Sequence, residues 1–417
     1  MSAVPGAGRG RQVGPSDVRD VAIVGGGPAG SALALRLAGA GHDVVLIERS
    51  AEPAWRACGV FASPAAVARL RALGVESTTT ASLMRKIPAM RVETQSGTSF
   101  RLTYGDDGSL RTPAVGFDRP GLDRALLTAA RRAGVDVRTA TVATAIDLDA
   151  RPVGIRVRGQ VDEDVVRARV LVGADGIRSL VARAARVVVG ARLGRRIGLT
   201  FHVADAEPEV VRDARMVVLD GAYCGLAPVP GGRVNVGIVL VSGAWRRVLA
   251  DEGAARVADR VLAGIPRAVD DPTDWRRAPR CDAIVGVSPL GHAVAKRTGD
   301  AWLLVGDAAG FLDPFTGEGL HRALVSAELA AVTIERRLVR GDGLTAYDRA
   351  MRRRFGGKDI ATLLVQAFLL APAAFDYAAR RLATRRAVRE TMGRVIGDLL
   401  PASRALDPRF LAALLWP

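Results

Sequence analysis

Cysteine and histidine are scarce in this sequence. Its 417 residues include three cysteines and four histidines, and Cys58, Cys224 and Cys281 do not form a CxxC spacing. A disulfide framework and a structural zinc site both need more numerous or more regularly spaced ligands. We therefore expect no metal site, and a reducing, cytoplasmic environment.

Long hydrophobic runs are missing as well. Residues 1–18 are rich in glycine and arginine and lack the apolar core of a signal peptide, which predicts a disordered N-terminal tail. The nearest membrane candidate runs from Ile360 to Phe375, but Asp359 and Asp376 bracket it and Pro372 interrupts it. This segment is too short to predict a membrane span.

Negative charge is in short supply, with 43 Asp and Glu against 59 Lys and Arg and a formal net charge of +16. Such an excess favours anionic partners such as nucleic acid, a membrane surface or a phosphorylated ligand. The arginines are spread along the chain without a nucleic-acid-binding motif, so we expect no nucleic-acid partner. Tail arginines at 352–354 and 380–381 form either a solvated helix face or a peripheral contact with anionic lipid.

A βαβ pattern opens the chain. Val21–Val24 has the composition of a short buried strand, 25–30 of a glycine turn, 31–40 of a helix and 44–47 of a second buried strand. Later buried strands belong to the same unit, but strand-rich segments interrupt it. The fold class is therefore α/β: a Rossmann-type dinucleotide-binding domain with an inserted strand-rich substrate domain and a helical C-terminal tail. The predicted bounds are 19–75, 115–185 and 288–340 for the first domain, 76–114 and 186–287 for the second, and 341–417 for the tail.

The glycine turn has the spacing of a dinucleotide site. Gly25 allows the tight turn, Gly27 lets the backbone approach a pyrophosphate, and Gly30 lets the helix pack closely on the strand. The helix that follows presents free N–H groups to the phosphates. Glu48 lies at the end of the second strand, where an acid binds a ribose hydroxyl. Strand, turn, helix, strand and acid in this order predict a dinucleotide site, although they do not separate FAD from NAD.

Two later segments resemble flavoprotein motifs. Residues 172–179 (VGADGIRS) resemble the DG motif of the FAD-dependent aromatic hydroxylase (flavoprotein monooxygenase) superfamily, and 304–310 (LVGDAAG) resemble its GD motif. With the opening GxGxxG, the three signatures stand in the superfamily's order across most of the chain. Aspartate at a strand end can accept hydrogen bonds from ribityl or ribose hydroxyls, and glycine beside it allows close backbone approach. The resemblance implies an FAD-binding domain.

Three other segments resemble the geranylgeranyl reductase branch of that superfamily. The loop at 311–323 (FLDPFTGEGLHRA) is similar to the branch's TGEG loop, and 56–59 (RACG) is similar to its cysteine–glycine segment. Residues 223–237 resemble its Y.W.FP.G…NVG segment, but Leu226 and Ala227 stand where the branch has Trp and Phe. This departure weakens the case for an isoprenoid substrate.

The resemblance implies FAD contacts from several parts of the chain. The glycine turn, Glu48 and Arg49 would hold the ADP half, Asp175 would lie near the pyrophosphate, and Asp307 would hold ribityl hydroxyls. Backbone N–H groups at 317–320 would face the pyrimidine edge of the isoalloxazine and stabilise negative charge there. The implied cofactor-binding residues are Gly25, Gly27, Pro28, Ala29, Gly30, Glu48, Arg49, Arg119, Val142, Asp175, Gly306, Asp307, Pro314, Gly317, Glu318, Gly319 and Leu320.

Cys58 and His321 are the candidate catalytic residues. Cys58 falls in the segment that resembles the family's cysteine near the flavin, and otherwise is a small buried residue. His321 follows the glycine-rich loop, where it could donate a proton, and otherwise caps or solvates the helix.

Two enzymatic interpretations fit these motifs. In the first, NAD(P)H reduces FAD, and the enzyme saturates a carbon–carbon double bond of an apolar, isoprenoid-like substrate. In the second, it is a monooxygenase that hydroxylates an aromatic or polyketide-like ring. The TGEG loop and Cys58 favour the reductase. A flavin halogenase is disfavoured because a Trp-x-Trp-x-Ile-Pro segment is absent, and a non-catalytic flavin-binding protein is the remaining alternative.

Overall fold

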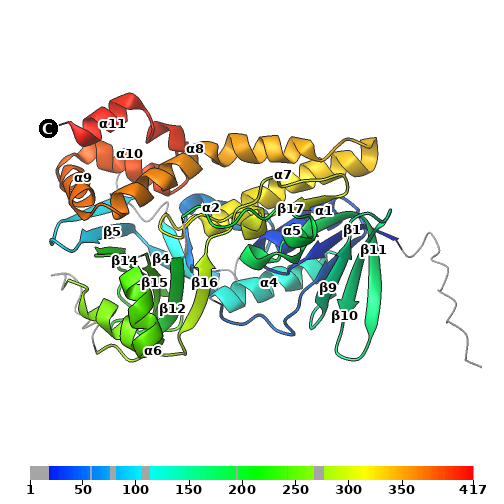
Figure 1. The fold of residues 1–417 in the computed structure, drawn as a ribbon, viewed down its shortest axis with the longest axis horizontal. Helices are drawn as coiled ribbons and strands as arrows, with labels where there is room; N and C mark the ends of the chain where they lie inside the picture. Colours follow the sequence, from blue (N-terminus) through cyan, green and yellow to red (C-terminus); the bar gives the residue numbers. More distant parts are fainter. Residues whose placement is uncertain are drawn as a thin grey trace, which may run out of the picture.

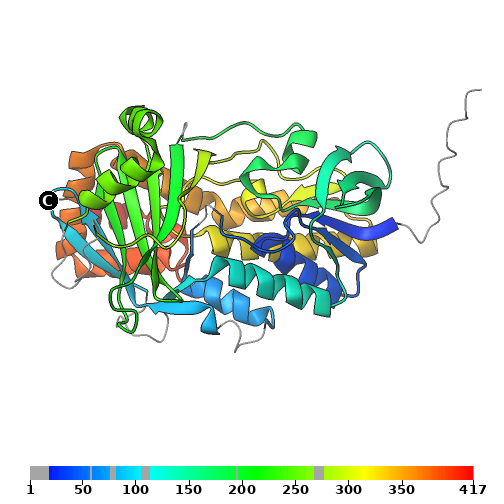
Figure 2. The same ribbon diagram turned by 90° about the horizontal axis from the view of Figure 1, so that it is seen from below.

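The computed structural model describes residues 18–56, 59–75, 81–104, 113–193, 196–241, 243–266 and 277–416. Within these residues two large sheets lie side by side, and helices cover their outer faces (Figures 1 and 2). The predicted α/β class is confirmed. The division into domains at the predicted boundaries stays a prediction.

The first sheet contains the opening βαβ unit: β1 (Val18–Val24), α1 (Pro28–Gly39) and β2 (Val44–Ile47). β1 pairs in parallel with β2 and with β11 (Glu163–Gly173), and β11 pairs in parallel with β17 (Trp302–Leu304). The carboxyl ends of β1, β11 and β17 therefore lie at one edge of the sheet, where open α/β sheets bind ligands. The full order is β8 (Asp136–Arg138), β2, β1, β11, β10 (Val153–Arg158) and β9 (Val142–Asp147), with β17 beside β11.

Three helices pack over one face of this sheet: α1, α4 (Arg119–Arg132) and α7 (Gly319–Arg340). The alanine-rich sequence from Gly319 to about Arg340 predicts a long helix, and α7 has these bounds. Ile23 of β1, Leu33 of α1 and Leu324 of α7 belong to one core, and each is at most 1% exposed. Burying such a side chain stabilises the fold by about 1.5–3 kcal/mol, so this core holds the carboxyl edge in place.

The second sheet comes from two separate parts of the chain. β5 (Ala89–Thr94) and β6 (Ser99–Thr103) join strands from the 196–290 region, because β5 pairs in parallel with β13. α6 (Gly243–Ala263), which is kinked at Gly253, packs on this sheet (Figure 1). The remaining strands are β12 (Arg196–Ala204), β13 (Ala214–Leu219), β14 (Ala222–Val229), β15 (Arg233–Leu240) and β16 (Val285–Leu290).

A small third sheet links the two large ones. β7 (Ala114–Phe117) pairs with β3 (Phe61–Ala62) and β4 (Met84–Ile87), although β3 and β7 fall at the ends of segments predicted for the dinucleotide-binding domain. A Cβ at Gly116 would lie 1.9 Å from the Pro228 carbonyl oxygen. The backbones of β7 and β14 therefore approach each other closely at this junction.

The C-terminal region is helical, as predicted from its sequence. α8 (Thr345–Leu369) runs beside α7, and three shorter helices cover the far end of the second sheet (Figure 1). None of the described helices is long and apolar enough by itself to cross a membrane. α8 and α9 pass the length and hydropathy test only as a pair, which is bent by 115°. The shorter helices are α9 (Pro372–Thr384), α10 (Arg386–Ile396) and α11 (Pro408–Leu415).

Candidate functional site

The three motif loops meet at the carboxyl edge of the first sheet. The Ala174 amide donates to the Val24 carbonyl at 2.8 Å, and the Val305 amide donates to the Gly173 carbonyl at 2.9 Å. The glycine turn, the DG segment and the GD segment therefore follow adjacent parallel strands. Residues distant in sequence are brought together here, as the motif order predicts.

The three turn glycines have different surroundings. Gly25 has a φ of +110°, and a Cβ there would lie 2.4 Å from the Ala174 carbonyl oxygen. A Cβ at Gly30 would lie 2.0 Å from the Gly25 carbonyl oxygen, so Gly30 allows α1 to pack against the turn. Among the described residues, a Cβ at Gly27 would have only the Arg119 Nη2 within 4 Å, at 3.8 Å. Gly27 therefore borders open space, as expected where a pyrophosphate approaches the backbone.

Glu48 is buried behind the turn. Its carboxylate accepts hydrogen bonds from the Gly26 amide at 2.8 Å and the Ser50 amide at 3.0 Å, and it pairs with Arg56 at 2.9 Å. Burial works against ionisation, but these hydrogen bonds and the Arg56 charge outweigh it, so the pKa of Glu48 lies below its usual 4.5. Arg56 is a partner that our sequence analysis did not assign to the site.

Replacing Glu48 by glutamine tests this arrangement through pH. Because the folded-state pKa is lowered, the carboxylate stabilises the fold above pH 4.5, and this contribution disappears as the pH falls through the folded-state value. We expect Glu48→Gln to lose about 1–3 kcal/mol near neutral pH. Urea midpoints measured from pH ~6 to ~3 should then fall less steeply for the variant than for the wild type.

Glu52→Gln is the matched control for this experiment. Its side chain is 76% exposed and lies 3.5 Å from Arg124. The control should follow the wild-type acid profile. Identical profiles for Glu48→Gln and the wild type would contradict the assigned role of Glu48.

Arg119 lies beside the glycine turn. It begins α4, and its Nε lies 2.9 Å from the Asp123 carboxylate. Burial raises the pKa of Asp307, and the charges of Arg119 and Arg322 act in the opposite direction. The charge of Arg119 therefore favours the ionised form of Asp307.

Asp175 has an unsatisfied acceptor. Its Oδ2 accepts from the Leu180 amide at 2.6 Å, but its Oδ1 is buried and has no hydrogen-bond partner among the described residues. Burial raises the pKa of this carboxyl, against hydrogen bonds from Ser179 and Leu180. Buried acceptors are rarely left without a donor, so Asp175 Oδ1 is a candidate contact for a ligand.

The GD loop needs glycine at two positions. Gly306 has a φ of +58°, a Cβ there would lie 2.8 Å from the Ala29 Cβ, and its amide donates to Ser326 Oγ at 2.9 Å. Gly317 has a φ of +65°, and a Cβ there would lie 2.5 Å from the Phe61 ring. Gly319 begins α7, and a Cβ there would have no heavy atom of the described residues within 4 Å. The helix N-terminus therefore faces free space, as needed for a contact with a flavin.

Four further residues were predicted to contact FAD: Val142, Arg49, Pro314 and Glu318. The Thr141 amide donates to the Glu48 carbonyl at 3.0 Å, which puts Val142, at the start of β9, next to the acid. Arg49 is exposed, and Pro314 accepts a hydrogen bond from the Gly317 amide at 2.9 Å within the loop. Glu318 is buried and pairs with Arg322 and Lys358, so its side chain is directed into the protein.

His321 lies on the α7 face that packs against the C-terminal region. It is 1% exposed, with the Arg354 guanidinium 3.2 Å from Nε2 and the Asp398 carboxylate 3.6 Å from Nδ1. Burial, which Asp398 only partly offsets, lowers the pKa of His321 to about 3. At neutral pH this ring is therefore the neutral imidazole, which is a far weaker acid than the imidazolium, so the geometry favours a structural role. Cys58 lies outside the described residues.

Sequence reasoning missed a buried polar cluster beneath the loop, centred on Asp313. Asp313 pairs with Arg196 of β12 at 2.7 Å and accepts from the Tyr223 hydroxyl of β14 at 2.5 Å and the Gln366 amide of α8 at 2.7 Å. Burial raises the pKa of Asp313, against the Tyr223 hydrogen bond and the Arg196 charge. The only local signal was an acidic residue before Pro314. The cluster ties the loop to the second sheet and to α8.

The fold and this site define an FAD-dependent oxidoreductase, and comparisons with known proteins agree. The model of the FAD binding domain family matches residues 19–349. The chain belongs to that family, in its geranylgeranyl reductase-like branch.

Two curated relatives and one solved structure illustrate the similarity. Digeranylgeranylglycerophospholipid reductase 2 of Methanopyrus kandleri is 31% identical over 81% of this chain and 83% of its own. Menaquinone reductase of Mycolicibacterium smegmatis is 30% identical over 79% of this chain and 78% of its own. A flavoprotein/dehydrogenase from Cytophaga hutchinsonii has the same fold, with a TM-score of 0.79 over 94% of this chain and 95% of its own, at 17% identity.

Proposed function

We propose that this protein is an FAD-dependent reductase that saturates a carbon–carbon double bond of an apolar, isoprenoid-like substrate with electrons from NAD(P)H. The similarity to reductases named for a digeranylgeranyl lipid and a menaquinone carries this proposal. NAD(P)H delivers a hydride equivalent, and a proton completes the addition across the double bond. One NAD(P)H is therefore consumed for each bond saturated.

The residues at the carboxyl edge fit FAD. Gly27 borders open space, Asp175 Oδ1 lacks a donor, and a Cβ at Gly319 would have no described atom within 4 Å. When bound, FAD supplies two-electron transfer between the nicotinamide and the substrate. Glu48 would hold a ribose hydroxyl, and the free amides of the glycine turn would bind the pyrophosphate.

The start of α7 supplies the electrostatics. Its first amides, at 318–320, with the partial positive charge of a 22-residue helix, would stabilise negative charge at the pyrimidine edge. Arg119 would contribute a second positive charge beside the phosphates. Asp307 would orient ribityl hydroxyls, since it is half-buried and lies at the strand end.

Of the two candidate catalytic residues, we retain Cys58 and assign it the role of proton donor. The pKa of His321 is about 3, and its nitrogens are directed to Arg354 and Asp398. Cys58→Ala should lower the rate of substrate reduction without lowering the rate at which NAD(P)H reduces the bound flavin. Stopped-flow measurement of both half-reactions separates the two steps.

Product analysis under two atmospheres tests the proposed function. FAD-loaded protein is incubated with NAD(P)H and a polyprenyl lipid or a menaquinone, with and without oxygen. Anaerobic saturation of a double bond supports the reductase. Products that gain an oxygen atom, with no anaerobic turnover, overturn it in favour of the monooxygenase.

We also propose that the corner between α8 and α9 contacts a membrane surface, from which an apolar substrate would be drawn. No charged side chain occurs from Ile360 to Phe375, and Ile360, Leu364 and Leu370 are 54%, 41% and 65% exposed. The exposed arginines at 352–354 lie one to two turns before this stripe. Apolar insertion combined with attraction to anionic lipid is the usual basis of peripheral binding.

Charge introduced on this corner should release the protein from vesicles. We expect Leu364→Glu/Leu370→Glu to lower partitioning onto anionic vesicles at least about tenfold, measured by co-sedimentation. The control, Val332→Glu/Val339→Glu, changes two valines of α7 that are 51% and 71% exposed. Equal loss in both double variants would show that net charge alone governs binding, and would contradict the assigned corner.

A further inference from the structure

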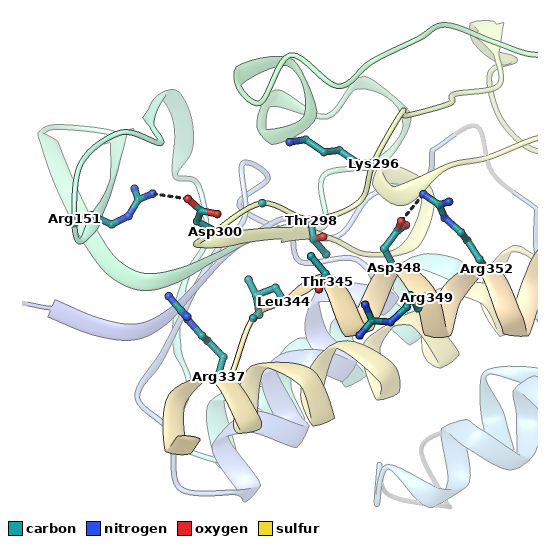
Figure 3. Close-up of a pocket in the computed structure, with 12 residues that line it drawn as sticks. Arg151, Lys296, Thr298, Asp300, Arg337, Leu344, Thr345, Asp348, Arg349 and Arg352 are labelled. Atoms are coloured by element: carbon teal, nitrogen blue, oxygen red, sulfur yellow. Dashed lines mark ion pairs between the residues drawn. The ribbon is translucent and has the colours of Figure 1, made fainter. Parts of the chain in front are cut away.

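A basic pocket lies at the opposite edge of the first sheet, away from the motif loops. It has a volume of about 670 Å³ and is formed by the turn before β17, the end of α7 and the first two turns of α8 (Figure 3). Because β17 is parallel to β1 and β11, this turn lies at the amino ends of the strands, whereas the glycine motifs lie at their carboxyl ends. The proposed FAD site does not use this pocket.

The charges that line the pocket are unbalanced. Five basic side chains and two carboxylates line it, and both carboxylates are already paired. Asp300 lies 3.6 Å from Arg151, and Asp348 lies 2.7 Å from Arg352 and 3.0 Å from Arg297, which does not line the pocket. Lys296, Arg337 and Arg349 are left without a carboxylate partner within the described part of the chain, and Figure 3 shows them on three sides of the pocket.

Two further features point to an anion. Thr298 lines the pocket and is 5% exposed, and its hydroxyl makes no hydrogen bond to any residue that the structure describes. α8 begins here, and its N-cap, Leu344, supplies no side-chain hydrogen bond to the first amides. A hydroxyl that lines the pocket and has no protein partner can donate to an anion, and an uncapped helix N-terminus binds anions.

We propose that this pocket binds the polyphosphate group of a small molecule. Lys296 and Arg349 would neutralise the phosphates, Thr298 would donate a hydrogen bond, and the first two amides of α8, at 345–346, would bind the remaining oxygens. The volume exceeds the need of a single phosphate and falls within the usual range of small-molecule sites, about 300–1,000 Å³. A bound polyphosphate would link the turn before β17 to α7 and α8.

Calorimetric titration of the FAD-loaded protein with pyrophosphate tests this site. We expect saturable binding that Lys296→Gln/Arg349→Gln weakens at least about tenfold, since two charge-assisted contacts are removed. The control, Arg71→Gln/Arg247→Gln, removes the same charge from exposed arginines outside the pocket and should change the affinity less than about twofold.

Three results would overturn the proposal. If pyrophosphate shows no saturable binding, the pocket is not a polyphosphate site. If both double variants bind pyrophosphate equally weakly, the effect is a general response to net charge. If FAD is released during the titration, as measured by its visible absorbance, pyrophosphate occupies the cofactor site instead. A parallel titration with glycerol 3-phosphate distinguishes the source: binding as tight as that of pyrophosphate would overturn the polyphosphate class in favour of a lipid headgroup.

Discussion

Replacing Gly27 by valine should abolish FAD retention while the apoprotein keeps its fold. Gly27 has extended backbone angles, φ −73° and ψ −177°, which valine adopts without strain. Among the described residues, a Cβ there has only Arg119 Nη2 within 4 Å, so the protein has room for it. The added side chain fills the space through which a pyrophosphate would approach the turn. We expect FAD affinity to fall at least about 100-fold, or about 2.8 kcal/mol.

The other glycines of α1 supply the controls. Gly39→Val changes the last residue of the same helix, where no described atom lies within 4 Å of an added Cβ, and should retain FAD. Gly30→Val should lower apoprotein stability as well as FAD content, because its Cβ meets the Gly25 carbonyl oxygen at 2.0 Å. FAD content is read from visible absorbance after gel filtration, and fold from circular dichroism and thermal melting of each apoprotein. Normal FAD content in Gly27→Val would contradict the assigned site.

The parts of the site that sequence could predict are set by local rules. Val21–Val24, Gly25, Gly30 and Glu48 lie within one βαβ unit, in which strand period, tight turn and close helix packing each restrict residue type. The bounds of α7 were predictable for the same reason, since a glycine lies at each end of its apolar repeat. Such signals need no knowledge of distant contacts.

The Asp313 cluster could not be predicted in this way. Arg196, Tyr223 and Gln366 lie 117, 90 and 53 residues from Asp313 in the sequence, and only the packing of three structural parts brings them together. His321 shows the opposite case, in which a residue close to the loop in sequence is not directed into the site. It directly follows the loop, but the helical rotation of α7 directs it towards α8 and Asp398.

Asp313→Asn should be strongly destabilising. Asp313 and Arg196 are 0% and 2% exposed at their side chains, so removing the carboxylate charge leaves a buried guanidinium without its counter-ion. Breaking a buried pair on one side costs about 3–5 kcal/mol. Tyr223 would also lose a charged acceptor in a site where burial already raises the pKa of its hydroxyl well above 10. Urea unfolding followed by tryptophan fluorescence measures the loss.

A double-mutant cycle separates the pair from general damage to the core. If the uncompensated guanidinium causes the loss, Arg196→Met should recover part of the stability in the Asp313→Asn background, because the methionine buries no charge. Glu390→Gln, which breaks an exposed pair with Arg386, should leave the midpoint unchanged.

Since Asp313 also accepts from the Phe315 amide at 3.0 Å, its replacement loosens the loop that leads to Gly317 and Gly319. FAD affinity should therefore fall together with stability in Asp313→Asn, and an unchanged FAD affinity would show that the cluster stabilises the fold without positioning the loop.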